Sequence, residues 1–168
     1  MHQPGTLMRI AITGHRELPP ATERLVDQAI REQLAAYAGP DLVGVSCLAD
    51  GADQIFARAV LDTGGQIDVI VPAARYRAGL PESSHGTYDS LLAKASHVDR
   101  LDRIESTEEA HMEASNAMLS RADRLFAVWD GQPARGYGGT ADVVSEARKR
   151  GTPVTIIWPE GARRSQAA

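Results

Sequence analysis

Short apolar runs alternate with amphipathic helical patterns along this chain, and that alternation restricts the folds open to it. The clearest runs, which have the length and aliphatic content of buried strands, are residues 8–13, 42–47, 67–71, 125–129 and 154–158. Residues 98–101 are predicted as a further short strand. Repeated strand–helix units build a mostly parallel sheet with helices on both faces. The sequence therefore predicts an α/β fold of three layers.

Helices are predicted between these strands, where apolar residues recur at helical spacing. The helices after the first and second strands end near Gly39 and Gly64, because glycine is favoured just past a helix end. A third helix is predicted around residues 88–95. It follows a segment at residues 73–87 whose length is typical of a lid or a binding loop.

Three helix starts are predicted from capping residues. Ser106 and Glu109 have the spacing of a capping box, which opens a helix that runs to about Arg121. Thr140 is expected to cap the last helix. Asp53 is expected to cap the helix that follows the second strand, because a carboxylate accepts hydrogen bonds from first-turn N–H groups.

Length and composition fit one domain without a membrane segment. The 168 residues are 43% hydrophobic and 24% charged, as in ordinary globular proteins. We expect a single domain over residues 1–168, with an ordered core at about 7–160 and a flexible tail at 161–168. No run of about 18 apolar residues occurs, and residues 1–6 do not resemble a secretory signal. A cytoplasmic location is therefore predicted.

Cysteine, histidine and charge content argue against several classes of site. The single cysteine, Cys47, cannot form an intramolecular disulfide, and its place at the end of an apolar strand predicts a small buried hydrophobe. The five histidines lack metal-ligand spacing, so no metal and no cofactor are predicted. A net charge of -4 and a pI near 5.7 make nucleic acid an unlikely partner in this prediction. A small anionic ligand remains compatible with this composition.

The residues that follow strands are the candidates for ligand binding, because open α/β sheets bind ligands at the carboxyl ends of their strands. Behind the first strand, Gly14 permits a tight turn and Arg16 can pair with a phosphate or carboxylate. His15 can donate or accept a hydrogen bond near neutral pH. We interpret the three as ligand-binding residues. The alternative is a solvated turn in which Arg16 pairs with a neighbouring helix.

The second and third strands are followed by further candidates. Asp50 and Gly51 precede a helix, and a glycine at that position lets the backbone approach a phosphate or ribose. Pro72 ends the third strand. Tyr76, a little further on, can stack on a base or can be an ordinary loop residue, and the sequence does not decide between the two.

The carboxyl half of the chain supplies the strongest candidate. Asn116 is a poor residue for the middle of a helix, which indicates either a polar function or helix–helix hydrogen bonding. Asp130 follows a strand and can bind ribose hydroxyls or cap a turn. Gly138, Gly139 and Thr140 lie between a strand and a helix, where free backbone donors favour a phosphate. The sequence thus predicts a phosphate-binding loop there.

Residues 12–16 and 45–53 resemble the strand–turn–helix signatures of the SLOG superfamily, a group of Rossmann-like domains named after the DNA-processing protein DprA and the LOG enzymes. Gly138-Gly139-Thr140 is similar to the end of the glycine loop of LOG proteins. The resemblance covers nearly all of the chain and implies a three-layer Rossmann-like fold.

LOG enzymes remove the base from a nucleoside monophosphate, and the resemblance raises the same activity here. That chemistry requires a carboxylate to help water attack the ribose and a cation to hold the phosphate. Val143 stands where LOG proteins have a glutamate, and Asp142 lies one place earlier. The arginine of LOG proteins has no counterpart near Asn116. Asp142 and Glu113 are the remaining candidate catalytic acids.

The resulting hypothesis is a stand-alone SLOG-type domain that binds a nucleotide or nucleotide-derived ligand as a sensor or binding protein. The alternative is a LOG-like hydrolase or a related nucleotide-sugar processing enzyme. A homodimer is expected from the resemblance. The helix with Met112 and Met118 can supply its contact, although both side chains serve equally well in the core of a monomer.

Overall fold

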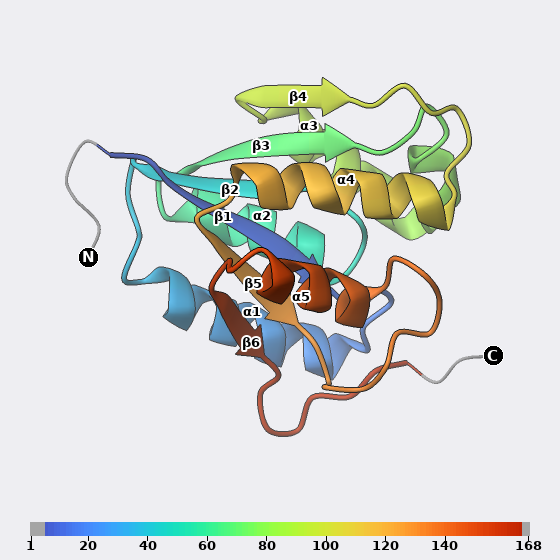
Figure 1. The fold of residues 1–168 in the computed structure, drawn as a ribbon. Helices are drawn as coiled ribbons and strands as arrows, with labels where there is room; N and C mark the ends of the chain where they lie inside the picture. The colour runs from blue at the N-terminus through green and yellow to red at the C-terminus, as the bar shows by residue number, and fades with distance from the viewer. Residues whose placement is uncertain (1–5, 166–168) are drawn as a thin grey trace.

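The structure is a computed structural model that describes residues 6–165 (Figure 1). A six-stranded parallel sheet in the order β4-β3-β2-β1-β5-β6 forms its centre. The strands are β1 (Met8–Gly14), β2 (Leu42–Ser46), β3 (Gln66–Val71), β4 (His97–Arg100), β5 (Arg124–Val128) and β6 (Val154–Ile157). The predicted α/β fold of three layers is confirmed, including the short strand β4 at the sheet edge.

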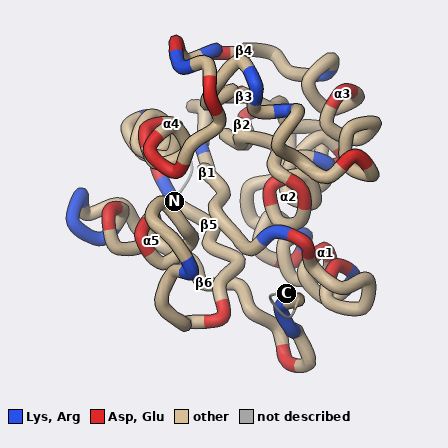
Figure 2. Tube along the Cα trace, turned by 90° about the vertical axis from the view of Figure 1, so that its right-hand side faces the viewer, with Lys and Arg blue, Asp and Glu red and all other residues tan. Residues whose placement is uncertain are grey.

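Helices cover both faces of the sheet, as Figures 1 and 2 show from two directions. One face carries α1 (Pro20–Leu34), α2 (Ala52–Asp62) and α3 (His85–Ala93), and the other carries α4 (Glu108–Arg121) and α5 (Thr140–Lys149). The chain builds outward from β1 to β4 and then returns to the other side of β1 to form β5. The order therefore reverses between β1 and β5, which is where such sheets bind ligands.

The core explains why the central strands read as continuous apolar runs. Ile10, Ile12 and Leu125 have no exposed surface, as expected for parallel strands that are covered on both faces. Gly44 of β2 allows α2 to approach, because a Cβ there would lie 2.8 Å from the ring of Phe56. This close packing fixes the position of α2 against the sheet.

The start of α4 differs from the prediction by one residue. Its N-cap is Thr107, whose Oγ1 accepts a hydrogen bond from the Ala110 N–H at 3.1 Å. Thr107 has the extended backbone that an N-cap requires. Ser106 instead forms a 2.7 Å hydrogen bond between its Oγ and Nε2 of His111. The predicted capping box at Ser106 is therefore wrong.

The two other predicted caps are wrong as well. Thr140 is the first residue of α5, and the N-cap is Gly139, which makes no side-chain hydrogen bond. Asp53 lies inside α2, whose N-cap is Gly51. Gly51 has a φ of +84°, a left-handed conformation that favours glycine at the start of α2, whereas Gly139 has an extended backbone with a φ of -72°. In both helices the polar residue lies in the first turn and not at the cap.

The segment predicted as a long loop contains regular structure. It holds two short 3-10 turns, Arg77–Gly79 and Glu82–Ser84, and α3 begins at His85, three residues earlier than predicted. The first residues of the segment are held by a 2.9 Å hydrogen bond from the Ala74 N–H to the Arg103 carbonyl oxygen. The segment therefore forms a fixed wall beside the carboxyl end of β3.

The chain after β6 runs back across the start of α1. The Arg163 N–H donates to Oγ1 of Thr22 at 2.9 Å, and Oγ of Ser165 donates to the Glu17 carbonyl oxygen. The flexibility predicted for residues 161–168 stays a prediction, and residues 166–168 lie outside the described part. Within residues 6–165, no helix is long and apolar enough to cross a bilayer.

Candidate functional site

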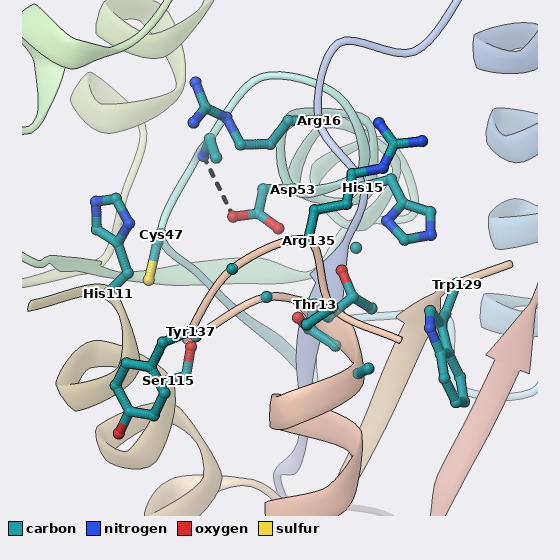
Figure 3. A pocket seen from close by; sticks show the side chains of 18 of the residues that line it. Thr13, His15, Arg16, Cys47, Asp53, His111, Ser115, Trp129, Arg135 and Tyr137 are labelled. Atoms are coloured by element: carbon teal, nitrogen blue, oxygen red, sulfur yellow. Dashed lines mark hydrogen bonds between the residues drawn. The ribbon is translucent and has the colours of Figure 1, made fainter. Parts of the chain in front are cut away.

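A cavity of about 280 Å³ opens at the carboxyl ends of β1 and β5. Its walls come from the loops after four strands, from α4 and from the segment after β6, and Figure 3 shows their side chains around it. The predicted ligand-binding residues that line it are Gly14, His15, Arg16, Pro72, Gly138, Gly139 and Thr140. The predicted residues that do not line it are Asp50, Gly51, Asn116 and Asp130.

Two glycines let the start of α2 pack directly against the end of β1. A Cβ on Gly14 would lie 2.4 Å from Cβ of Ala52. Gly51 has a φ of +84°, and a Cβ there would lie 2.6 Å from the His15 carbonyl oxygen. That same oxygen accepts a 3.2 Å hydrogen bond from the Ala52 N–H. A donor at the start of α2 is thus used within the protein, and Gly51 brings two loops together.

Arg16 lines the cavity and is oriented by Asp50. Its Nε donates to Oδ1 of Asp50 at 2.8 Å, and Oδ2 of Asp50 accepts the Glu17 N–H at 2.9 Å. The Arg16 side chain is 41% exposed, and in the described part of the chain its two Nη groups have no hydrogen-bond partner. Asp50 thus fixes the guanidinium while leaving its outer nitrogens open to an anion.

His15 is a buried, neutral side chain of the cavity wall. Its Nε2 accepts a 3.0 Å hydrogen bond from the Asp130 N–H and lies 3.2 Å from Oδ1 of Asp130. Burial first, and then the charge of Arg164, lower the pKa of His15. The ring also meets Trp158 edge-on, with 5.5 Å between centroids. An unprotonated Nε2 is what the hydrogen bond from Asp130 requires.

The loop at residues 131–139, called the glycine loop below, is held by two carboxylates. Oε2 of Glu108 accepts the Tyr137 N–H at 3.0 Å, and Oδ2 of Asp142 accepts the Gly138 N–H at 2.9 Å. Gly138 has a φ of +83°, and a Cβ there would lie 3.0 Å from the Glu108 carbonyl oxygen. Glycine is therefore needed for this loop to lie so close to α4.

The N-terminus of α5 leaves two backbone donors open at the cavity. Thr140 and Ala141 both line it, and within residues 6–165 their N–H groups have no hydrogen-bond partner. The next N–H groups, those of Asp142 and Val143, bond back to the Gly139 carbonyl oxygen. Open donors at the positive end of a helix dipole attract an anion.

Asp53 supplies a buried carboxyl group to the cavity. It is 8% exposed, and its Oδ2 accepts the Ala49 N–H at 3.2 Å (Figure 3). Burial raises the pKa of Asp53 to about 7, although the Ala49 hydrogen bond and the charge of Arg16 oppose that shift. The carboxyl group therefore changes protonation near neutral pH.

The opposite wall is mainly apolar. Cys47 is buried, as predicted, with its Sγ 3.9 Å from Sδ of Met118, and burial raises the pKa of its thiol. Tyr76 packs edge-on against His111, with 5.7 Å between ring centroids. Because only 4% of Tyr76 is exposed, its ring offers little surface for base stacking. This wall suits the apolar face of a ligand.

Neither predicted catalytic acid lines the cavity. Oε2 of Glu113 accepts from Nε of Arg103 at 2.7 Å on the surface of α4. Asp142 holds the Gly138 N–H. Asn116 lies outside the lining, and its buried Oδ1 has no hydrogen-bond partner among the described residues. In residues 6–165, no three His, Cys, Asp or Glu side chains are grouped so as to hold a metal ion.

Other lining residues were not singled out by sequence reasoning. Trp129, Arg135 and Arg164 line the cavity, and Asp53 was interpreted only as a helix cap. Sequence position could have indicated two of them, because Trp129 directly follows β5 and Arg135 lies inside the glycine loop. No local signal marks Arg164, because its place depends on how the chain after β6 returns to α1.

Comparisons with known proteins identify the fold. The sequence matches no protein-family model and no curated protein sequence. Among solved structures, DprA from Helicobacter pylori superposes with a TM-score of 0.68 and 17% identity over 95% of this chain. DprA from Streptococcus pneumoniae superposes with a TM-score of 0.65 and 16% identity over 92% of this chain. The Moco carrier protein from Chlamydomonas reinhardtii superposes with a TM-score of 0.54 and 18% identity over 90% of this chain. The chain has a SLOG-type fold. The fold implied by the sequence resemblance is therefore confirmed.

These similarities concern the fold alone. The chain spans 69% of the H. pylori DprA chain, 52% of the S. pneumoniae chain and 76% of the Moco carrier protein. The H. pylori protein has a unique single-stranded DNA binding mode. That likeness gives no support to the prediction that nucleic acid is an unlikely partner.

Proposed function

We propose that the cavity binds a nucleotide or nucleotide-derived ligand, with a phosphate at the N-terminus of α5. The observation that carries this proposal is the pair of open N–H groups of Thr140 and Ala141 at the cavity. The open Nη groups of Arg16 supply a cation on the same cavity. Together they offer backbone donors and a positive charge to an anionic ligand in the cavity.

The size and the apolar wall of the cavity support a small ligand. Ligand pockets usually measure about 300–1,000 Å³ and combine apolar walls with a few polar groups. At about 280 Å³, this cavity suits a mononucleotide-sized molecule. Tyr137 is 56% exposed beside it, which leaves an aromatic ring free to cover a bound base or sugar.

Calorimetry with AMP, GMP, CMP and UMP, each compared with its nucleoside, tests the phosphate site. We expect Thr140→Pro to weaken nucleotide binding at least fivefold, because proline removes one open N–H. The extended ψ of 177° at Gly139 accommodates a following proline, and proline is tolerated in the first turn of a helix. Thr140→Ala is the matched control, since it removes the hydroxyl and keeps the N–H. Equal binding of nucleotides and nucleosides would refute the proposal.

A second candidate function is hydrolysis of the bond between base and ribose. The observation that favours it is the Asp53 carboxyl group in the cavity, whose pKa of about 7 suits a general acid or base. Incubation with nucleoside monophosphates and separation of the free base tests it. Release must fall by about 100-fold or more in Asp53→Asn for this role to hold.

Single-stranded DNA is the competing ligand that the DprA likeness suggests. In the view of Figure 2, acidic and basic residues are interspersed along the trace without a continuous basic stripe. We therefore expect the chain to bind mononucleotides better than labelled single-stranded DNA at 150 mM salt. Tighter DNA binding with a steep salt dependence would favour the nucleic-acid function instead.

We further propose a single-domain homodimer in the cytoplasm. Met112 and Met118 are both buried, so they pack within the protein and do not supply the contact between copies. Light scattering after size-exclusion chromatography measures the oligomeric state directly.

A further inference from the structure

Two arginines from segments far apart in the sequence line the cavity near His15. Arg135 belongs to the loop at residues 131–139, and Arg164 follows β6. In Figure 3 the side chain of Arg135 runs toward His15. The pKa of Arg164 is lowered by burial first and by the charge of Arg135 second. Nη1 of Arg135 lies 3.3 Å from the carbonyl oxygen of Ser165, the residue that follows Arg164, so the two arginines lie on neighbouring parts of the cavity wall. Their like charges repel each other.

The charge of these arginines is incompletely compensated. The Arg164 side chain is only 18% exposed, and its Nη1 lies 4.0 Å from Oδ2 of Asp130, which is too long for a hydrogen bond. Oδ1 of Asp130 already accepts the Gln132 N–H at 3.0 Å. Within residues 6–165, the one hydrogen bond of the Arg135 side chain goes to the uncharged carbonyl oxygen of Ser165, at 3.3 Å. Arg164 is largely covered, and such a cation is unfavourable unless it is paired, whereas Arg135 is exposed.

The backbone holds Arg164 in place from both sides. Gly161 has a φ of +89°, which turns the chain back after β6. The Arg163 N–H is bound to Oγ1 of Thr22, and the Ser165 hydroxyl is bound to the Glu17 carbonyl oxygen. The backbone that carries Arg164 is therefore held beside the cavity before any ligand arrives, which lowers the entropic cost of binding.

We infer that Arg135 and Arg164 form a second anion site in the cavity and that the ligand is a nucleotide with a second phosphate group. This inference rests on the proposed function, which places the first phosphate at α5. Two arginines can form forked hydrogen bonds to one phosphate and replace their mutual repulsion by attraction. The neutral His15 beside them adds no further repulsion.

The test compares the affinities of nucleotides that differ in one phosphate. Calorimetry measures dissociation constants for AMP, ADP and adenosine 3′,5′-bisphosphate, and for the guanosine counterparts. We expect at least one of the doubly phosphorylated probes to bind ten or more times tighter than the monophosphate of the same base. The two probe types distinguish a diphosphate from two separated phosphates.

Substitutions of the two arginines test whether they cause the tighter binding of the doubly phosphorylated probes. We expect the ratio of the two dissociation constants to fall to near 1 in Arg135→Gln and in Arg164→Gln. Arg163→Gln is the matched control, because Arg163 lies next in the chain and does not line the cavity. Its ratio should equal that of the unsubstituted protein. Should Arg164→Gln fail to fold by circular dichroism, Arg135→Gln carries the test.

The possible failures are distinguishable. Monophosphates that bind without any gain from a second phosphate would overturn the second site and leave the proposed function intact. A gain that survives both arginine substitutions would also overturn it. If no nucleotide binds at all, the proposed function and this inference fall together.

Discussion

Asp53 shows how burial changes a residue whose place in the sequence suggests an ordinary helix cap. Its carboxyl group lies in the cavity wall, bound to the Ala49 N–H and near Arg16. These two interactions favour the charged form, but the loss of hydration outweighs them, and the pKa rises from 3.8 to about 7. The folded protein therefore binds a proton at Asp53 more tightly than the unfolded chain does.

Asp53 should make the protein less stable as pH rises from about 4 to 7. In that window the folded state holds the proton and the unfolded state releases it, so the slope of unfolding free energy against pH is negative. The shift corresponds to about 4 kcal/mol, lost by pH 7 to 8. Asp53→Asn keeps an oxygen acceptor and removes the titration. Urea denaturation from pH 4 to 8 should show the variant gaining on the unsubstituted protein as pH rises.

Asp62→Asn is the matched control, because Asp62 lies on the same helix with 54% of its side chain exposed. The unfolding free energy of Asp62→Asn should change with pH as that of the unsubstituted protein does, to within a few tenths of a kcal/mol. Parallel profiles for Asp53→Asn and the unsubstituted protein would contradict the raised pKa.

Gly14→Ala should destabilise the protein by about 1–3 kcal/mol, since an added methyl group must separate α2 from the end of β1. The nearest atom, Cβ of Ala52, would lie 2.4 Å away and belongs to a buried helix start. Chemical denaturation measures the loss. Gly86→Ala is the control, because nothing lies within 4 Å of a Cβ at Gly86. Equal stability of both variants would argue against this close approach.

At the scale of elements, the glycine loop and α5 form one unit that is held from two directions. Glu108 of α4 binds the loop at Tyr137, and Asp142 of α5 binds it at Gly138. The loop is thereby fixed while Thr140 and Ala141 keep their donors open. A carboxylate in the first turn also interacts favourably with the helix dipole.

Asp142→Ala should therefore loosen the loop and weaken ligand binding without removing any lining side chain. The expected loss of unfolding free energy is about 1 kcal/mol, for one hydrogen bond and one dipole interaction. Glu146→Ala on the same helix breaks only a surface ion pair with Arg150 and should cost about 0.5 kcal/mol or less. Denaturation gives the stabilities, and calorimetry with the best nucleotide gives the affinities. Equal stabilities and equal nucleotide affinities of the two variants would show that the loop does not depend on Asp142.

At the scale of the whole molecule, the fold was largely predictable because each central strand is a continuous apolar run. The short strand β4 was also found, although its residues are mostly exposed at the sheet edge. The caps of α4 and α5 are Thr107 and Gly139, each one residue away from the predicted cap, because the choice between neighbouring residues depends on backbone conformation.

The site was only partly predictable. Arg16 and the glycine loop follow strands directly, so the rule for parallel sheets finds them. The role of Asp53 depends on burial by residues elsewhere in the chain, and that of Arg164 on contacts with Thr22 and Glu17 across more than 140 positions. Residue type and spacing carry no information about such contacts.

The cavity joins loops from both sides of the sheet, so a ligand should protect them together. Hydrogen exchange with saturating nucleotide should slow in the loop at residues 131–139 and in residues 159–165 at once. Strand β4, at the far edge of the sheet and mostly exposed, should exchange unchanged, because exposed edge segments generally exchange through local opening. At a hundred times its dissociation constant, the ligand should stabilise the whole fold by about 2.7 kcal/mol. Protection of the glycine loop alone would mean that the segment carrying Arg164 takes no part in binding.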